Sequence, residues 1–228
     1  MALLGFLKRT LKDTLEKYGY EIRNLNRLRA ANAVAYNTAE YADRFYSNRK
    51  ELAIFREYVP QHLENLRKAL IKEKIVIHAD MAILDAGCGT GDCLKMLWDE
   101  YGCRRLTGID FSSSALALAR AACPQAELLQ VTMDQRLQHD FDLILCQQVL
   151  EHLTHPEKAL QNFLAMLRPG GTILVTVPDG RLDDFAGHIH FWGLDSLPLF
   201  LQKELPGCTI RSGRLQDGVS LYGAIRKT

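Results

Sequence analysis

Two carboxylates and three glycines have the types and spacing needed to bind a ribose-containing ligand. Gly87, Gly89 and Gly91 alternate after an apolar run that ends in Asp85, and Asp110 ends the next apolar run, nineteen positions after Gly91. Alternate glycines permit a sharp turn and leave no Cβ where a ligand must lie against the main chain. An acid at this offset can accept hydrogen bonds from ribose hydroxyls. The pattern predicts a strand, a glycine turn, a helix and a second strand.

The spacing of the turn restricts the kind of ligand. Dinucleotide sites usually read G-x-G-x-x-G, whereas this chain has G-x-G-x-G with Asp85 two residues upstream. A carboxylate at that point would repel a pyrophosphate but could attract an ammonium or a sulfonium group. The helix is expected to begin at Asp92, whose side chain could cap free backbone N–H groups. These residues predict a ligand that combines a ribose with a cation.

The motif D-x-G-x-G-x-G, followed by the second acid, resembles the first motifs of the class I S-adenosylmethionine-dependent methyltransferases. The resemblance implies that S-adenosylmethionine is the cofactor, that the turn at residues 85–91 holds its methionine part and that Asp110 holds the ribose. The cofactor-binding residues expected on this basis are Asp85, Gly87, Cys88, Gly89, Gly91, Asp110, Phe111, Met133, Asp134 and Gln147.

Two later segments extend the resemblance. Residues 141–153, FDLILCQQVLEHL, are similar to the family's fourth motif, in which the backbone around Cys146 and Gln147 would face the transferable methyl group. Asp134 follows a short predicted strand, where the family often has an acid that binds the adenine amino group. The residues before it depart from the usual pattern, so the alternative is that Met133 contacts the adenine face.

Histidines are the candidate catalytic residues. A sulfonium methyl is already a good electrophile, so the protein's main task is to align the acceptor and exclude water. A hydroxyl acceptor also gains from a base, and His152 is the best placed, although it could instead hydrogen-bond the loop backbone. His188 and His190 lie in GHIHFW, which resembles a methyltransferase H-x-x-F-[FW] stretch; in an extended segment one would face substrate and the other would pack. No metal site is predicted, because no ligand pair has helical spacing.

Composition indicates an ordinary soluble protein. The 228 residues are 47% hydrophobic and 24% charged, and a formal net charge of +1 gives no field to gather nucleic acid. Six cysteines without a C-x-x-C pair are typical of reduced core residues, which favours a cytoplasmic location. The first apolar run is too short for a secretory signal, and no stretch approaches the length of a membrane span.

Alternating strands and helices over residues 81–177 predict a Rossmann-like, doubly wound α/β sheet that is mostly parallel. Strands at 209–215 and 219–226, joined through an Asp-Gly pair, predict a C-terminal antiparallel hairpin, as the class I methyltransferase fold has and the dinucleotide fold lacks. Pro60 is expected to begin a new helix over residues 61–74, ahead of the first strand.

We expect a helical N-terminal extension or lid at residues 1–60 and the methyltransferase domain at residues 61–228. Residues 1–30 have the spacing of an amphipathic basic helix, which could dock on the protein or a partner, or contact a membrane surface through residues 1–18. By the resemblance, the segment before the glycine turn often folds over the cofactor. Its candidate lining residues are Tyr36, Tyr41 and Tyr46. Their spacing fits helix packing equally well.

The function predicted from these motifs is methyl transfer from S-adenosylmethionine to a small-molecule or lipid-like acceptor, with oxygen acceptors favoured. One alternative is a methyltransferase-like module that binds without turnover. Another is an NAD-dependent oxidoreductase, disfavoured by the glycine spacing, Asp85 and the terminal hairpin. The sequence predicts no nucleic-acid partner and no particular oligomeric state.

Overall fold

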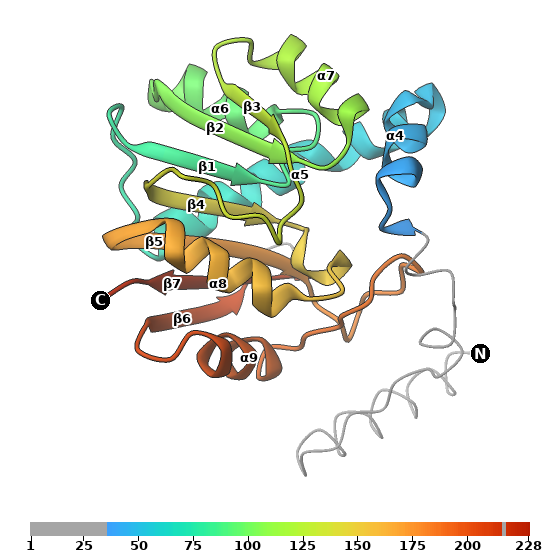
Figure 1. Ribbon diagram of the computed structural model, residues 1–228. Coiled ribbons are helices and arrows are strands. Elements are labelled where there is room, and N and C mark those ends of the chain that lie inside the picture. Colours follow the sequence, from blue (N-terminus) through green and yellow to red (C-terminus); the bar gives the residue numbers. More distant parts are fainter. Residues whose placement is uncertain (1–35, 216–217) are drawn as a thin grey trace, which may run out of the picture.

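The predicted strands join in one seven-stranded sheet in the computed structural model, which describes residues 36–215 and 218–228 (Figure 1). The strand order is β3-β2-β1-β4-β5-β7-β6. The strands are β1 Ala82–Ala86, β2 Arg105–Asp110, β3 Glu127–Gln130, β4 Phe141–Gln147, β5 Leu167–Pro178, β6 Thr209–Arg214 and β7 Ser220–Arg226. β1 to β5 pair in parallel, and β7 is antiparallel to both of its neighbours. The predicted fold class is confirmed, including the closing hairpin.

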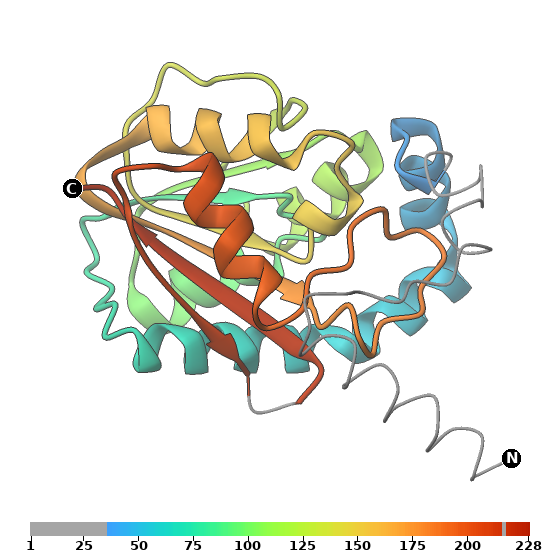
Figure 2. The ribbon, with the colours of Figure 1, turned by 90° about the horizontal axis from the view of Figure 1, so that it is seen from below.

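Burial on both faces explains why the central strands β1 and β4 are nearly continuous apolar runs. Along β1, Leu84 belongs to one buried cluster and Ile83 to the other, because successive side chains point to opposite faces. The first cluster lies under α8 and α9, and the second lies under α5, α6 and α7. Figures 1 and 2 show α8 and α5 on opposite sides of the sheet. A parallel sheet needs this double cover, since neither of its faces is polar.

The helices in the described residues are α4 Ala39–Ser47, α5 Arg49–Lys72, α6 Asp92–Tyr101, α7 Ser113–Ala122, the 3-10 turn η1 Leu150–His152, α8 Pro156–Met166 and α9 Ser196–Glu204. No described helix is both long and apolar enough to cross a membrane. The predicted basic helix at residues 1–30, and with it the membrane contact through residues 1–18, lies outside the described residues.

The prediction that Pro60 begins a helix is wrong. α5 starts eleven residues earlier, after Asn48, whose side chain accepts hydrogen bonds from the backbone N–H groups of Lys50 and Glu51. It then continues through Pro60. Proline removes one helical hydrogen bond, and here both Pro60 and Arg56, whose carbonyl loses that bond, are exposed to water. The proposed domain boundary at residue 60 therefore falls inside a helix, and the division remains a prediction.

α4 is fixed against the start of α7 by Asp43. The Asp43 carboxylate accepts hydrogen bonds from the Ser112 hydroxyl at 2.6 Å, the Ser114 backbone N–H at 2.9 Å and the Ser113 hydroxyl at 3.2 Å. The Ser112 hydroxyl lowers the pKa of Asp43 and is the main cause of that shift. These contacts hold α4 beside the carboxyl ends of β1 and β2, where parallel sheets place their ligands.

Candidate active site

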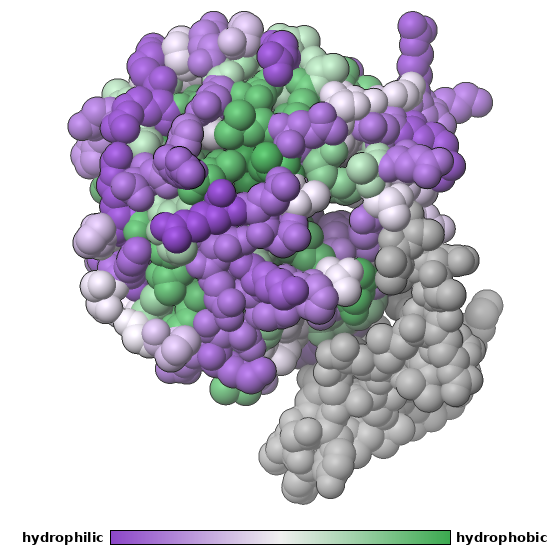
Figure 3. Space-filling model, viewed as in Figure 1, coloured by the Kyte–Doolittle hydropathy of each residue, from purple (hydrophilic) through white to green (hydrophobic). Residues whose placement is uncertain are grey.

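A cavity of about 730 Å³ opens at the carboxyl ends of β1, β2 and β4, and α4 and the first half of α5 close its other side. In Figure 3 the surface is hollowed beside α4. Its size falls within the range of about 300–1,000 Å³ typical of ligand pockets. The predicted site residues that line it are Asp85, Gly87, Cys88, Gly89, Asp110, Phe111, Met133, Gln147, His152 and His188. Gly91 and Asp134 are not among the lining residues.

The glycine turn has the backbone that its sequence predicts. Gly87, Gly89 and Gly91 all have positive φ, at 79°, 50° and 80°. A Cβ at Gly87 would lie 2.4 Å from Val149, which follows β4, so glycine here also permits a close approach between loops. Only glycine adopts these three conformations without strain.

Gly91 has a packing role and lies behind the cavity wall. A Cβ at this position would lie 2.7 Å from the Cα of Ala119 in α7, so the residue lets α6 and α7 pack closely. The predicted cap by Asp92 is not present: Gly91 occupies the cap position, and the Asp92 carboxylate accepts a hydrogen bond from the Thr90 hydroxyl. Because glycine has no side chain, the residue at the cap position of α6 makes no side-chain hydrogen bond to the first turn.

Asp85 is a buried carboxylate with an unsatisfied atom. Its side chain is 2% exposed, and Oδ2 has no hydrogen-bond partner in the part of the chain that the structure describes. Burial raises the pKa of Asp85 to about 7, although a hydrogen bond with the Cys93 thiol opposes the shift. A buried carboxylate without a donor is costly, and a cation in the adjoining cavity would remove that cost. The site therefore fits a ligand that carries an ammonium group.

Asp110 links the end of β2 to the glycine turn. Its Oδ2 accepts from the Gly89 backbone N–H at 3.0 Å, and its Oδ1 accepts from the Ser112 N–H at 2.9 Å. Burial raises the pKa of this carboxyl group. Each oxygen of an ionised carboxylate can accept a second hydrogen bond, so the fixed group could still receive both hydroxyls of a ribose.

The structure separates the two adenine candidates. Met133 is 7% exposed and lines the cavity, so its thioether could lie against a planar ring. Asp134 is exposed and accepts a hydrogen bond from the Thr132 hydroxyl. Gln147, at the end of β4, also lines the cavity. The geometry favours Met133 over Asp134, and the contacts themselves stay predictions.

His152 and His188 meet at the cavity wall with their ring centres 4.5 Å apart. His152 Nδ1 lies 2.9 Å from the Asn37 side-chain oxygen and 3.3 Å from the Gly187 carbonyl, so the ring contacts loop backbone as well as the cavity. Burial, followed by the neighbouring His188, lowers the pKa of His152 to about 4. His152 is therefore uncharged at neutral pH, and its basicity is low.

The two histidines of GHIHFW have different environments, as predicted. His188 faces the cavity, and its Nδ1 lies 2.5 Å from the Asp183 carboxylate. His190 stacks on Trp192 with ring centres 5.0 Å apart and contacts the Leu153 carbonyl through Nε2 at 2.9 Å. Only the first is available to a ligand in this cavity.

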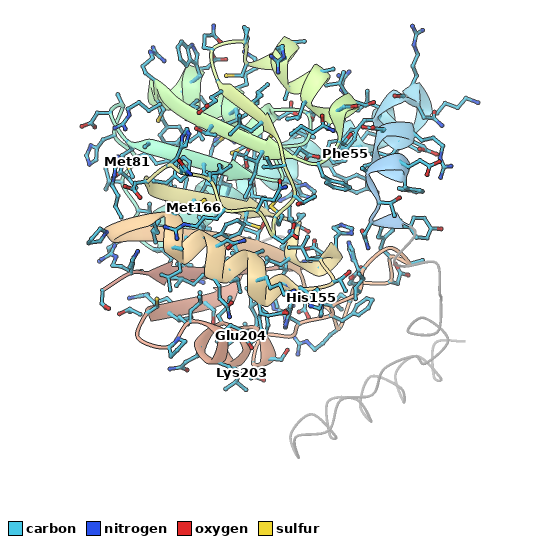
Figure 4. The ribbon with its side chains drawn as sticks, viewed as in Figure 1. Phe55, Met81, His155, Met166, Lys203 and Glu204 are labelled. Carbon is cyan, nitrogen blue, oxygen red and sulfur yellow. The ribbon has the colours of Figure 1, made fainter. Side chains whose placement is uncertain are left out.

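Aromatic side chains form the wall opposite the glycine turn. Tyr36, Tyr41 and Tyr46 all line the cavity, where they were expected as candidates. Phe55 extends from α5 toward the ends of the strands (Figure 4) and meets the Tyr46 ring at 6.0 Å between ring centres. Phe185, from the loop after β5, packs against Tyr36 with 6.1 Å between the ring centres.

Sequence reasoning considered Glu151 only as a ligand of a metal site that it did not predict, and it assigned no role to Asn37, Phe55 or Phe185. All four line the cavity. Glu151 is 0% exposed, and neither of its carboxylate oxygens has a hydrogen-bond partner among the described residues. Its place in the L-E-H motif was the one available signal. The other three come from segments far apart in the chain, so only the fold shows that they are neighbours.

Comparison with known proteins supports the assignment that this geometry suggests. The methyltransferase domain family matches residues 55–207. Trans-aconitate 2-methyltransferase of Variovorax paradoxus is 27% identical over 131 residues, which cover 57% of this chain and 50% of the relative. Ubiquinone biosynthesis O-methyltransferase of Coxiella burnetii is 32% identical over 121 residues, half of each chain. The chain thus spans about half the length of these curated relatives.

Solved structures share the fold. N-methyltransferase NodS from Bradyrhizobium japonicum, in complex with S-adenosylhomocysteine, has a TM-score of 0.62 at 23% identity, covering 84% of this chain and 98% of NodS. The plantazolicin methyltransferase BpumL, in complex with the same ligand, has a TM-score of 0.62 at 14% identity. The match covers 90% of this chain and 99% of BpumL. With the family match, the chain belongs to the class I S-adenosylmethionine-dependent methyltransferases, and S-adenosylmethionine is its cofactor.

Proposed function

We propose that this chain transfers a methyl group from S-adenosylmethionine to a small-molecule or lipid-like acceptor, with an oxygen acceptor favoured. The supporting observation is that one cavity joins the Asp85 and Asp110 carboxylates to an aromatic wall that carries His152 and His188. The names of the relatives, an O-methyltransferase of ubiquinone biosynthesis and a trans-aconitate methyltransferase, agree with small oxygen-containing acceptors.

The residues on the β1 and β2 side would hold the donor. Asp85 would pair with the ammonium group of its methionine part, and the bare backbone at Gly87 and Gly89 would lie against that part. Asp110 would accept from the ribose hydroxyls, and Met133 would cover the adenine. When bound, the donor supplies a sulfonium methyl that is already electrophilic, so no protein nucleophile is required.

The other half of the cavity would align the acceptor and exclude water. Tyr41, Phe55 and Phe185 give this half an apolar wall, which suits a planar or lipid-like acceptor. His152 is unprotonated at neutral pH and would accept the proton of a hydroxyl acceptor as a weak base. His188 has Nδ1 against Asp183, which leaves Nε2 as the nitrogen that can do the same.

The alternative functions have less support. The buried Asp85 carboxylate would repel the pyrophosphate of NAD, which argues against the oxidoreductase. A module without turnover remains the rival, because intact donor-binding residues do not require an acceptor. We also propose a cytoplasmic location, since all six cysteines are free.

The experiment that tests this proposal is a screen of fractionated metabolite and lipid extracts with methyl-labelled S-adenosylmethionine. We expect label in one small product, with loss on base treatment identifying an ester and mass spectrometry identifying the acceptor atom. Matched reactions with Asp110→Ala, at a donor concentration that half-saturates the wild type, should give much less product. Donor binding without label transfer to any fraction would favour the module without turnover.

A further inference from the structure

We propose that Glu151, His152 and His188 form a binding site for one divalent transition-metal ion in the wall of the cavity. One ligand atom from each residue lies within 4.8 Å of the others. Glu151 and His152 belong to η1, directly after β4, whereas His188 comes from the loop between β5 and α9. The fold therefore assembles from two distant segments a ligand set that neither segment contains.

Glu151 supplies the first argument for a cation. Its side chain is completely buried, and both carboxylate oxygens lack a hydrogen-bond partner among the residues that the structure describes. Buried polar groups are nearly always satisfied, so an acid with two unsatisfied oxygens facing a cavity indicates a missing positive partner. The two imidazole rings beside it are metal ligands by type, so an ion bound between the three side chains would satisfy the carboxylate.

The orientation of both histidines supplies the second argument. His188 Nδ1 lies 2.5 Å from the Asp183 carboxylate, and His152 Nδ1 lies 2.9 Å from the Asn37 side-chain oxygen. The Asn37 amide nitrogen donates to the Gly187 carbonyl at 2.9 Å, which fixes the amide with its oxygen toward His152. An acceptor beside each Nδ1 favours the tautomer that leaves the lone pair on Nε2, as in histidines that ligate metals, and with the ion bound neither imidazole would act as the base.

The ligand types define the class of ion. Two imidazoles and one carboxylate suit Zn²⁺, Mn²⁺, Fe²⁺ or Co²⁺ rather than Ca²⁺ or Mg²⁺. Ligand bonds of about 2.1 Å in a tetrahedral site place ligand atoms about 3.4 Å apart, so the side chains need to approach by about 1 Å or less per residue. Three protein ligands would leave a position open for a ligand such as an acceptor oxygen.

The test uses the full chain, freed of metal with a chelator, in the absence of any methyl donor. Co²⁺ is titrated while visible absorption reports its coordination, and calorimetry with Zn²⁺ and Mn²⁺ gives the stoichiometry. We expect one ion per chain. Glu151→Gln and His188→Gln should each weaken binding by more than about 100-fold, since loss of a second-shell partner alone costs about 10–100-fold. Asp183→Asn should fall in that lower range.

His155→Gln is the matched control. His155 precedes α8 at the surface (Figure 4), 58% exposed and 3.0 Å from Glu157, so its loss should leave the affinity unchanged. Thermal melts check the fold of each variant, and if one of the two ligand variants does not fold, the other decides. The proposal is overturned if none of the ions binds the wild type below millimolar concentration, or if the ligand variants keep wild-type affinity. Because no donor is present, neither result bears on methyl transfer.

Discussion

The substitution Asp85→Asn separates the cost of a buried carboxylate from its use in donor binding. Asparagine has nearly the same shape and no charge, so the variant keeps the packing at the end of β1. The pKa of Asp85 in the folded protein is about 7, against an ordinary value of 3.8, because burial disfavours the charged form. The unfolded chain therefore releases this proton at a lower pH than the folded protein does.

The sign of the effect follows from the raised pKa. The protonated carboxyl group is favourable below pH 4, and this contribution is lost as the pH rises through 7. A difference of about three pKa units, at about 1.36 kcal/mol each, lowers the free energy of unfolding of the wild type above pH 7 by roughly 4 kcal/mol relative to its value below pH 4. Asp85→Asn has no such loss, so its stability relative to the wild type should rise by about 1.4 kcal/mol per pH unit between pH 5 and 7.

Urea denaturation of the ligand-free proteins from pH 5 to 8 measures the stability difference, and calorimetry with S-adenosylhomocysteine measures binding over the same range. Wild-type affinity should increase as the pH rises to 7, because the ammonium group of the ligand needs the ionised carboxylate. The variant should bind with little pH dependence and, at pH 8, about 10–150-fold more weakly. Parallel stability curves for the two proteins, together with parallel affinity curves, would refute this reasoning.

Three further substitutions test other parts of the site. Gly91→Ala should lower the free energy of unfolding, measured in urea, by about 2–4 kcal/mol, because alanine is strained at this positive φ and its Cβ would clash with Ala119. Gly170→Ala is the control: this residue also has a positive φ but open space around it, so it should lose only about 1–2 kcal/mol from strain. Equal losses would contradict the packing role of Gly91. Asp110→Ala should weaken S-adenosylhomocysteine binding by about 1.5–3 kcal/mol in calorimetry, and unchanged affinity would mean that the ribose assignment is wrong. Asp43→Ala removes the contacts to the serines at the start of α7, so amide hydrogen exchange should become faster in α4 and stay unchanged in β1. Unchanged exchange in α4 would show that these contacts do not hold the helix.

The glycine turn and its two acids, which we propose hold the donor, were predictable because they are close in sequence. Asp85, the three glycines and Asp110 all lie within one strand–turn–helix–strand unit, whose backbone conformation and spacing follow from local rules. The closing hairpin was predictable for the same reason. The predicted cap by Asp92 is wrong because Asp92 is the first residue inside α6, and the cap position belongs to Gly91.

The acceptor half depends on tertiary contacts that have no local pattern. Glu151 and His188 are thirty-seven positions apart and meet only because the loop after β5 folds back over η1. That loop is held there by hydrogen bonds from the backbone N–H groups of Ile189 and His190 to the Glu151 carbonyl. The hydrophobic periodicity of the sequence does not predict such contacts. The helix through Pro60 was missed because proline is normally read as a start or stop signal, and its tolerance here depends on exposure.

The most direct test of the central claim is calorimetric titration of the full chain with S-adenosylhomocysteine and, separately, with NADH. Each titration is then repeated on protein that has been saturated with the other ligand. We expect one S-adenosylhomocysteine per chain with micromolar affinity, weakened about 10–150-fold by Asp110→Ala and unaffected by NADH. Saturable NADH binding that S-adenosylhomocysteine displaces, or no S-adenosylhomocysteine binding below millimolar concentration, would contradict the assignment of this cavity to a methyl donor.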